Sequence, residues 1–233
     1  MSNSLIPDTT GILLDGTGLE TELYLSLFHQ MKNYTDKCVL FTCNPKYKYK
    51  TKINEKCKVF YFESPLNYED FAKFTIFEFY KAVETKRFIT YHLDGYILNP
   101  HKWKDQFLDY DYIGAPWANS WKGEENLEPI NVGNGGFSIR NVEFMKCVAS
   151  IAHYENYNGV LGEDVYISVK LEKYLKKIGF TYAPIEIAKQ FSVETPIDCG
   201  RECWHFINNT FGFHGKVWYS ELKSYNYWVP EGK

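Results

Sequence analysis

The middle of the sequence reads Phe88-Ile89-Thr90-Tyr91-His92-Leu93-Asp94-Gly95, an apolar run that ends in a turn. β-Branched and aromatic residues followed by an Asp-Gly dipeptide predict a buried strand over residues 87–91. Because side chains alternate along an extended backbone, His92 and Asp94 are expected on the same side of the chain. The strand therefore delivers two potential metal ligands to its carboxyl end.

Strands and helices alternate on both sides of this run. Apolar periodicity predicts strands over 11–14, 38–42, 58–62, 111–115 and 136–139, and helices over 19–32, 67–83, 142–154 and 163–177. Such alternation is typical of a mixed, mainly parallel, Rossmann-like sheet with helices on both faces. We therefore predict an α/β fold in one domain over residues 1–233.

Two acidic turns are expected at the ligand-binding edge of this sheet. Ligands of open α/β sheets bind beyond the carboxyl ends of the strands. The turn Asp15-Gly16-Thr17-Gly18 follows the first predicted strand, and the turn at Asp94 follows the strand over 87–91. Asp15 and Asp94 are therefore candidates for contacts with a ligand.

The overall charge argues against nucleic acid and anionic membranes as partners. The chain has 26 basic and 29 acidic residues and a formal charge of −3 at pH 7, which supplies no general attraction to polyanions. Residues Met1–Thr10 do not combine a basic segment with an apolar stretch, and no window has the apolar length of a membrane span. We expect a soluble, cytoplasmic protein with no membrane span.

The 6 cysteines are widely spaced and do not indicate a disulfide framework. Cys199, Cys203 and His205 can ligate zinc, but the paired motifs of structural zinc sites are missing. Reduced, structural thiols are the favoured interpretation.

A glycine-rich segment and an acidic pair form two further candidates. Residues 131–140 read Asn-Val-Gly-Asn-Gly-Gly-Phe-Ser-Ile-Arg, in which glycines let the backbone approach a ligand and Asn134 offers a polar contact. A tight turn that enters a strand explains the same residues. In Gly162-Glu163-Asp164, one carboxylate can take a proton from a substrate hydroxyl. A preference for acids at a helix start explains this pair equally well.

The last candidate lies near the carboxyl end, where residues 211–218 read Phe-Gly-Phe-His-Gly-Lys-Val-Trp. His214 stands between glycines and can complete a metal shell, and Lys216 can contact a phosphate. An aromatic turn without a ligand is the alternative interpretation.

Together these segments resemble glycosyltransferases of the GT-A type, and most closely a poorly characterised glycosyltransferase-like family of bacteria and large viruses. The resemblance is carried by Tyr110–Trp117, which reads Tyr-Asp-Tyr-Ile-Gly-Ala-Pro-Trp, by Gly133–Arg140, and by Glu163-Asp164. Motifs carry it over about residues 70–215, and the order of elements carries it over the first 70.

The resemblance implies transfer of a sugar from a nucleoside diphosphate donor, such as a UDP- or GDP-sugar, to a hydroxyl of a glycan or other acceptor. Asp94 would match the final acid of the Asp-x-Asp metal motif, with His92 in place of the first acid. His214 resembles the late metal-binding histidine of several GT-A families. The implied cofactor is Mn²⁺ or Mg²⁺, and imidazole is an acceptable ligand for Mn²⁺.

The resemblance also implies roles on the donor and acceptor sides. In beta-4-galactosyltransferases a Gly-Glu-Asp run binds the acceptor and supplies the base, which makes Asp164 the expected base of an inverting reaction. Residues 1–100 would form the nucleotide-sugar half and residues 101–233 the acceptor half. The expected acceptor-binding residues are Glu163, Asn134 and Trp117, although a core position explains Trp117 equally well. The expected donor-binding residues are Asp15, Gly135, Gly136 and Lys216.

Two other functions stay open at this point. A sugar-phosphate nucleotidyltransferase on a similar sheet would need a basic, glycine-rich loop near the amino terminus, and the Asp15 turn has no adjacent Lys or Arg. A non-catalytic carbohydrate-binding or scaffold protein would explain why a histidine replaces the first acid of the metal motif.

Overall fold

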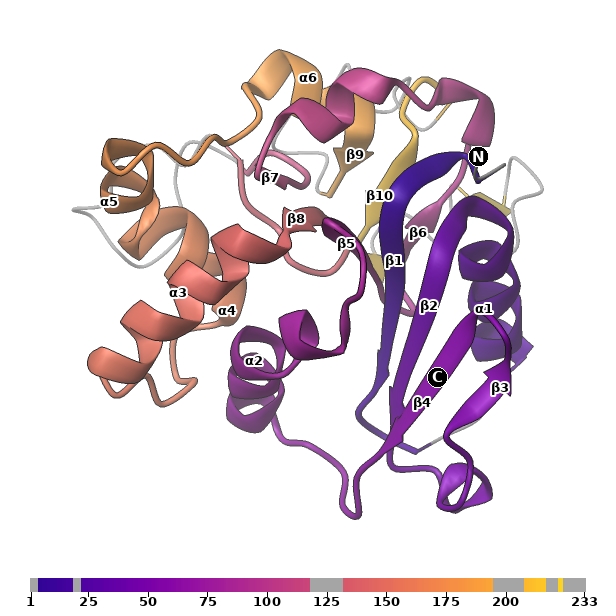
Figure 1. Cartoon of the computed structure of the whole chain (residues 1–233). Helices are drawn as coiled ribbons and strands as arrows, with labels where there is room; N and C mark the ends of the chain where they lie inside the picture. Colours follow the sequence, from indigo (N-terminus) through magenta and orange to yellow (C-terminus); the bar gives the residue numbers. More distant parts are fainter. Residues whose placement is uncertain (1–3, 19–21, 118–131, 195–207, 217–221, 224–233) are drawn as a thin grey trace.

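The computed structural model describes residues 4–18, 22–117, 132–194, 208–216 and 222–223, which form two β-sheets with helices packed around them (Figure 1). The possible zinc ligands Cys199, Cys203 and His205 lie outside the described residues.

The larger sheet has seven strands in the order β3-β4-β2-β1-β5-β8-β7. Its strands are β1 (Ile6–Asp15), β2 (Thr35–Thr42), β3 (Lys52–Asn54), β4 (Cys57–Tyr61), β5 (Arg87–Tyr91), β7 (Tyr112–Ile113) and β8 (Ile139–Asn141). The ladders that join β4, β2, β1 and β5 are parallel, whereas β3, β8 and β7 add antiparallel ladders at the two sides. The predictions of an α/β fold and of a mixed sheet are confirmed, whereas a mainly parallel, Rossmann-like sheet is not confirmed.

Helices cover both faces of this sheet, as predicted. Met31 of α1 (Glu22–Tyr34) packs over Gly11 of β1, where a Cβ atom would lie 2.9 Å from Met31 Cγ. Phe41 of β2 meets Phe74 of α2 (Tyr68–Phe77) at a ring distance of 5.0 Å. Gly11 pairs with Cys38, three residues before Phe41, so α1 and α2 lie on opposite faces.

The remaining helices surround the second half of the chain. They are α3 (Val142–Tyr154), α4 (Glu163–Val165), α5 (Glu172–Lys177) and α6 (Ile185–Phe191). The helix predicted over 67–83 ends at Phe77 and continues as a 3-10 turn over Phe79–Ala82, in which Phe79 stacks on Phe41 at 5.4 Å. The helix predicted over 163–177 is divided by a π-helical turn over Tyr166–Lys170.

A smaller sheet follows directly on β5. It contains β6 (Gly95–Ile97), β10 (Gly212–His214) and β9 (Ser192–Val193), in the order β6-β10-β9. An aromatic cluster forms the core beside it, in which Phe137 stacks on Phe191 at 5.1 Å and meets Tyr91 of β5 at 5.9 Å. The second half of the chain is therefore packed onto the first through aromatic rings.

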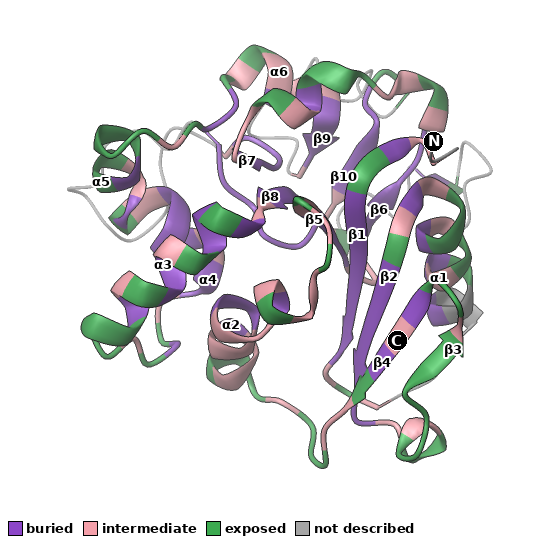
Figure 2. Cartoon of the chain, viewed as in Figure 1, coloured by how far each residue is buried: buried purple, intermediate pink, exposed green. Residues whose placement is uncertain are grey.

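Burial is deepest along the central strands, as Figure 2 shows for β1 and β5. β1 is buried from Thr9 to Asp15, so the turn that follows this strand begins at a buried residue. Within the described part of the chain, no helix has the length and apolar character that crossing a membrane requires.

We expect Phe41→Ala to lower the free energy of unfolding by about 3–5 kcal/mol, because it opens a cavity at the junction of β2, α2 and the Phe79 turn. Phe41 is 3% exposed. Urea denaturation followed by circular dichroism measures the change. Tyr49→Ala is the control, since Tyr49 is 91% exposed and a change within about 0.5 kcal/mol is expected. Equal effects of the two substitutions would contradict this account of the core.

Candidate functional site

One turn and one strand bring three potential metal ligands together. His92 and Asp94 lie in the turn between β5 and β6, where the His92 N–H donates to Gly95 O at 2.9 Å. β10 pairs with β6 in the register that sets His214 opposite Gly95. Ligand atoms of His92, Asp94 and His214 consequently lie within 4.8 Å of one another. Two imidazoles and a carboxylate can hold Mn²⁺ as a transition-metal ion, whereas Mg²⁺ prefers oxygen ligands, so of the two implied cations Mn²⁺ fits these residues better.

The two histidines of this group differ in their electrostatics. Burial and the nearby His214 lower the pKa of His92 to about 4, so its imidazole is neutral at pH 7 and available as a ligand. Burial also acts to lower the pKa of His214. The hydrogen bond that the protonated ring donates to Glu194 and the charges of Asp94 and Glu194 outweigh burial and raise it. A negative environment therefore surrounds His214, which suits a cation at this place.

The glycine-rich segment packs against the same group. Asn134 has a left-handed backbone (φ 58°) and is buried. Its Oδ1 accepts from the Phe137 N–H at 3.1 Å, and its Nδ2 lies 2.6 Å from His214 Nδ1. A Cβ at Gly136 would overlap the His214 ring, and one at Gly135 would overlap the Glu163 carboxylate. Both glycines are thus required by the protein's own side chains.

A buried ion pair stands behind this segment. Arg140 is fully buried, and its Nη2 donates to Glu163 Oε1 at 2.9 Å and to Gly135 O at 3.2 Å. Its Nε donates to Ser138 Oγ at 3.0 Å, and the guanidinium lies 5.4 Å from the Tyr112 ring centre. The pair fixes the start of α4 relative to the glycine segment. The predicted role of Glu163 in acceptor binding receives no support from this geometry.

Asp164 meets the glycine segment at Gly135, one residue before the glycine that packs against His214. Its Oδ2 accepts from the Gly135 N–H at 3.2 Å and its Oδ1 from the Val165 N–H at 2.8 Å. Burial and the charge of Glu163 raise the pKa of Asp164 to about 7, against the effect of these two hydrogen bonds. A carboxyl group with this pKa exchanges protons readily near neutral pH.

Glu194 was not predicted from the sequence, yet it contacts three of the candidate residues. Its Oε1 accepts from Asn134 Nδ2 at 2.8 Å and lies 3.2 Å from His214 Nδ1, and its Oε2 accepts from Trp117 Nε1. A carboxylate behind a ligating histidine fixes the orientation and tautomer of the ring. Glu194 follows a two-residue strand and belongs to no recognisable motif, so no sequence signal marks it.

The structure places the remaining candidates less centrally. Trp117 covers Gly133, where a Cβ would overlap its ring, and it is held by Glu194. Lys216 is exposed, two residues beyond His214. Asp15 does not belong to the His92–Asp94–His214 group. It accepts from Thr42 Oγ1 at 2.7 Å and from the Gly18 N–H at 2.8 Å.

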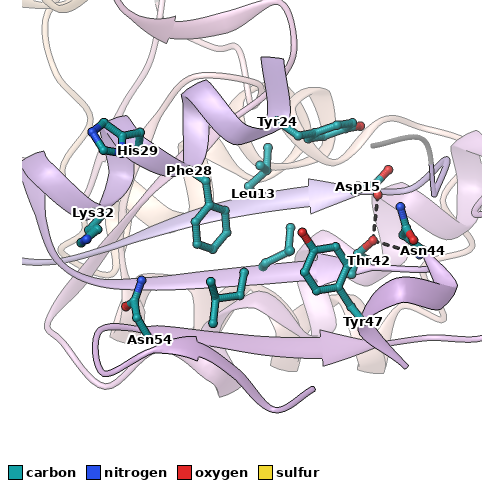
Figure 3. Close-up of a pocket in the computed structure, with 12 residues that line it drawn as sticks. Leu13, Asp15, Tyr24, Phe28, His29, Lys32, Thr42, Asn44, Tyr47 and Asn54 are labelled. Carbon is teal, nitrogen blue, oxygen red and sulfur yellow. Dashed lines mark hydrogen bonds between the residues drawn. The ribbon is translucent and has the colours of Figure 1, made fainter. Parts of the chain in front are cut away.

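Asp15 instead borders a pocket between α1 and the sheet, which Figure 3 shows with its lining residues. Leu13, Phe28 and Leu40 form its apolar floor, and Asn44 stands beside Asp15 at the carboxyl ends of β1 and β2. Leu40 and Phe41 point to opposite faces of the sheet, so this pocket opens on the face that α1 covers.

Two groups of candidates therefore emerge. Asp94, His92 and His214 form one cluster, and Asp164 adjoins it through Gly135 and Gly136, so residues far apart in sequence meet in one place. Asp15 lies at the neighbouring strand end on the other face.

Comparison with known proteins identifies the family of this chain, and the description of that family names no function. A family model described as "Protein of unknown function (DUF5672)" matches residues 51–214, and the chain belongs to this family. The match includes His92, Asp94 and His214, the glycine segment, Asp164 and Glu194. A search of curated proteins finds no match.

We expect Asp164→Asn to raise the free energy of unfolding at pH 8. The folded protein holds the Asp164 proton up to about pH 7, whereas an ordinary Asp loses it near pH 3.8. Folding therefore takes up a proton between these values, and the stability of the wild type falls as pH rises through them. The advantage of the variant should grow from about pH 4 to pH 7 and then level off. Urea denaturation at several pH values measures it. Asp109→Asn, which removes an exposed carboxylate, is the control. An advantage of Asp164→Asn that is independent of pH would refute the raised pKa.

Glu194→Gln is expected to lower the pKa of His214, because it removes a negative charge 3.2 Å from His214 Nδ1. NMR titration of the imidazole C–H resonances measures the change. Glu186→Gln is the matched control, since the Glu186 side chain is 82% exposed and pairs with Lys189. An unchanged or higher His214 pKa in Glu194→Gln would show that Glu194 does not act on this ring.

Proposed function

We propose that this protein is a GT-A-like glycosyltransferase that moves a sugar from a nucleoside diphosphate sugar to a hydroxyl acceptor, with inversion at the anomeric carbon. One observation carries the proposal: a two-imidazole, one-carboxylate cluster lies next to a carboxyl group whose pKa is raised to about 7. A leaving diphosphate needs a cation, and an attacking hydroxyl needs a base. The cluster and Asp164 supply candidates for both needs within one region.

On the donor side, His92, Asp94 and His214 would hold the divalent cation, and Mn²⁺ suits their two imidazole nitrogens better than Mg²⁺ does. When bound, the cation neutralises the charge that develops on the diphosphate as it departs. Glu194 keeps the His214 ring oriented through Nδ1, which leaves Nε2 directed toward Asp94 at 3.5 Å. Lys216 follows on an exposed segment and can approach a phosphate. Asp15 and its pocket, at the neighbouring strand end on the other face of the sheet, offer room for another part of the donor.

On the acceptor side, Asp164 is the proposed base. The acceptor oxygen forms a bond to the anomeric carbon, the bond from that carbon to the diphosphate oxygen breaks, and the hydroxyl proton passes to Asp164. The departing electron pair leaves with the nucleoside diphosphate. A base with a pKa of about 7 is partly ionised at neutral pH and strong enough to accept the proton.

Several residues of the sequence prediction take positioning roles in this proposal. Arg140 binds Glu163 and thereby holds α4, so that Asp164 faces the glycine segment. Asn134 joins that segment to Glu194 and His214. Gly135 and Gly136 leave the space that Glu163 and His214 occupy. These residues hold the two halves of the site at a fixed separation.

The proposal is tested by thermal-shift screening of nucleoside diphosphates and their sugars, with and without Mn²⁺, followed by donor hydrolysis without acceptor. We expect Mn²⁺-dependent stabilisation by a nucleoside diphosphate and slow release of the diphosphate from its sugar. Asp94→Ala should abolish the Mn²⁺-dependent shift. Asp164→Asn should keep that shift and lower transfer by about 10²–10⁴-fold, the contribution of a general base.

Asp109→Ala serves as the control for removal of an exposed acid, and it should behave like the wild type. Pyrophosphate release from a nucleoside triphosphate and a sugar phosphate would identify a nucleotidyltransferase instead. Binding of free glycans without nucleotide binding or hydrolysis would identify a non-catalytic carbohydrate-binding protein, which the histidine at position 92 favours.

A further inference from the structure

The first turn of α2 lies beside both halves of the candidate site. Tyr68 and Phe71 are three residues apart in this helix, so their side chains lie on one face of it. The Phe71 ring meets the His92 ring edge-on at 5.4 Å. A Cβ at Gly162 would overlap Tyr68 Oη and stand 3.2 Å from Asp164 Oδ1. One helix face therefore extends from a candidate metal ligand to the candidate base.

Tyr68 differs from the other aromatic residues of this region in its exposure. It is 66% exposed, whereas Phe71 is partly buried. Burial and the charges of Asp164 and Glu163 raise the pKa of Tyr68. The Tyr68 hydroxyl lies beside Gly162, next to the Asp164 carboxylate, while the residue as a whole stays 66% exposed.

We propose that Tyr68 binds the acceptor and that the acceptor is a pyranoside, whose apolar face stacks on the Tyr68 ring while one hydroxyl reaches Asp164. An aromatic face packs well against the axial C–H groups of a sugar ring, and the hydroxyls then bond at the edge of the aromatic ring. The Tyr68 hydroxyl and the Asp164 carboxylate both lie next to Gly162. A sugar stacked on the Tyr68 ring therefore has a hydroxyl near Asp164. The assignment deepens the proposed function and rests on it.

Trp117 is less suited to this role. Its indole N–H donates to Glu194, and its ring covers Gly133, so the protein itself uses both its polar and its apolar surfaces. Tyr68 is 66% exposed, so it has surface free to meet a ligand. The acceptor therefore lies on the α2 side of Asp164.

The test uses saturation-transfer NMR with methyl pyranosides as probes and glycerol as a polyol without a ring. We expect saturation of the pyranoside ring protons by the wild type and by Tyr68→Phe, which keeps the ring. Tyr68→Ala should weaken pyranoside binding by about tenfold, as expected for the loss of one aromatic stacking contact. Tyr154→Ala is the matched control, because Tyr154 is 88% exposed at the end of α3. Circular dichroism confirms that each variant is folded.

A kinetic measurement separates this inference from the proposed function. With a donor that the wild type hydrolyses, Tyr68→Ala should raise the KM for a methyl pyranoside about tenfold. Tyr68→Phe, which keeps the ring, should have the KM of the wild type. Pyranoside binding that depends on the Tyr68 ring in a protein that binds no nucleotide would support the sugar site and refute the transferase. Suppose instead that the protein hydrolyses the donor, but Tyr68→Ala binds the pyranoside as well as the wild type does, or glycerol binds equally well. The role of Tyr68 would then be refuted, and the proposed function would stand.

Discussion

The antiparallel pairing of β6 with β10 determines the arrangement of the candidate site. The pairing is only three residues long, and it sets His214 opposite Gly95 and joins the Gly215 N–H to Asp94 O at 2.7 Å. A shift of one residue would turn His214 to the other face of the strand and remove it from His92 and Asp94. The cluster therefore depends on the register of one short ladder, which the neighbouring aromatic core of Phe137, Phe191 and Phe211 supports.

The buried Arg140–Glu163 pair has the corresponding role for Asp164. Removing two charges from water is costly, and their attraction repays the cost only when further hydrogen bonds satisfy them. Ser138 Oγ and Gly135 O provide two such bonds for Arg140, but its buried Nη1 has no hydrogen-bond partner among the described residues. The ion pair thus gives little net stability, and its importance lies in fixing where α4 begins. Gly135 lies against the Glu163 carboxylate, and its N–H donates to Asp164. The ion pair and the Asp164 carboxyl group therefore meet the glycine segment at the same residue.

Local sequence patterns predicted the elements that are long or clearly bounded. β5 follows the predicted range of 87–91, and α3 follows the predicted 142–154, where Asn141 caps the helix by accepting from the Glu143 N–H. The smaller sheet was not predicted, because strands of two or three residues have no detectable periodicity and are defined by distant partners. Glu194 was missed for the same reason. The glycine segment was identified, but Gly135 and Gly136 accommodate Glu163 and His214, which a sequence cannot reveal before the fold is known.

The position of the His92–Asp94–His214 group bears on how firmly β10 is held against β6. His92 and Asp94 belong to the end of the large sheet, and His214 belongs to a strand that arrives from near the end of the chain. A ladder as short as β6–β10 opens easily when it is alone. A cation shared by the three side chains would fasten that strand to the sheet, since its binding free energy is available only while the ladder is intact. How often β10 separates from β6 would then depend on the concentration of divalent ions around the protein.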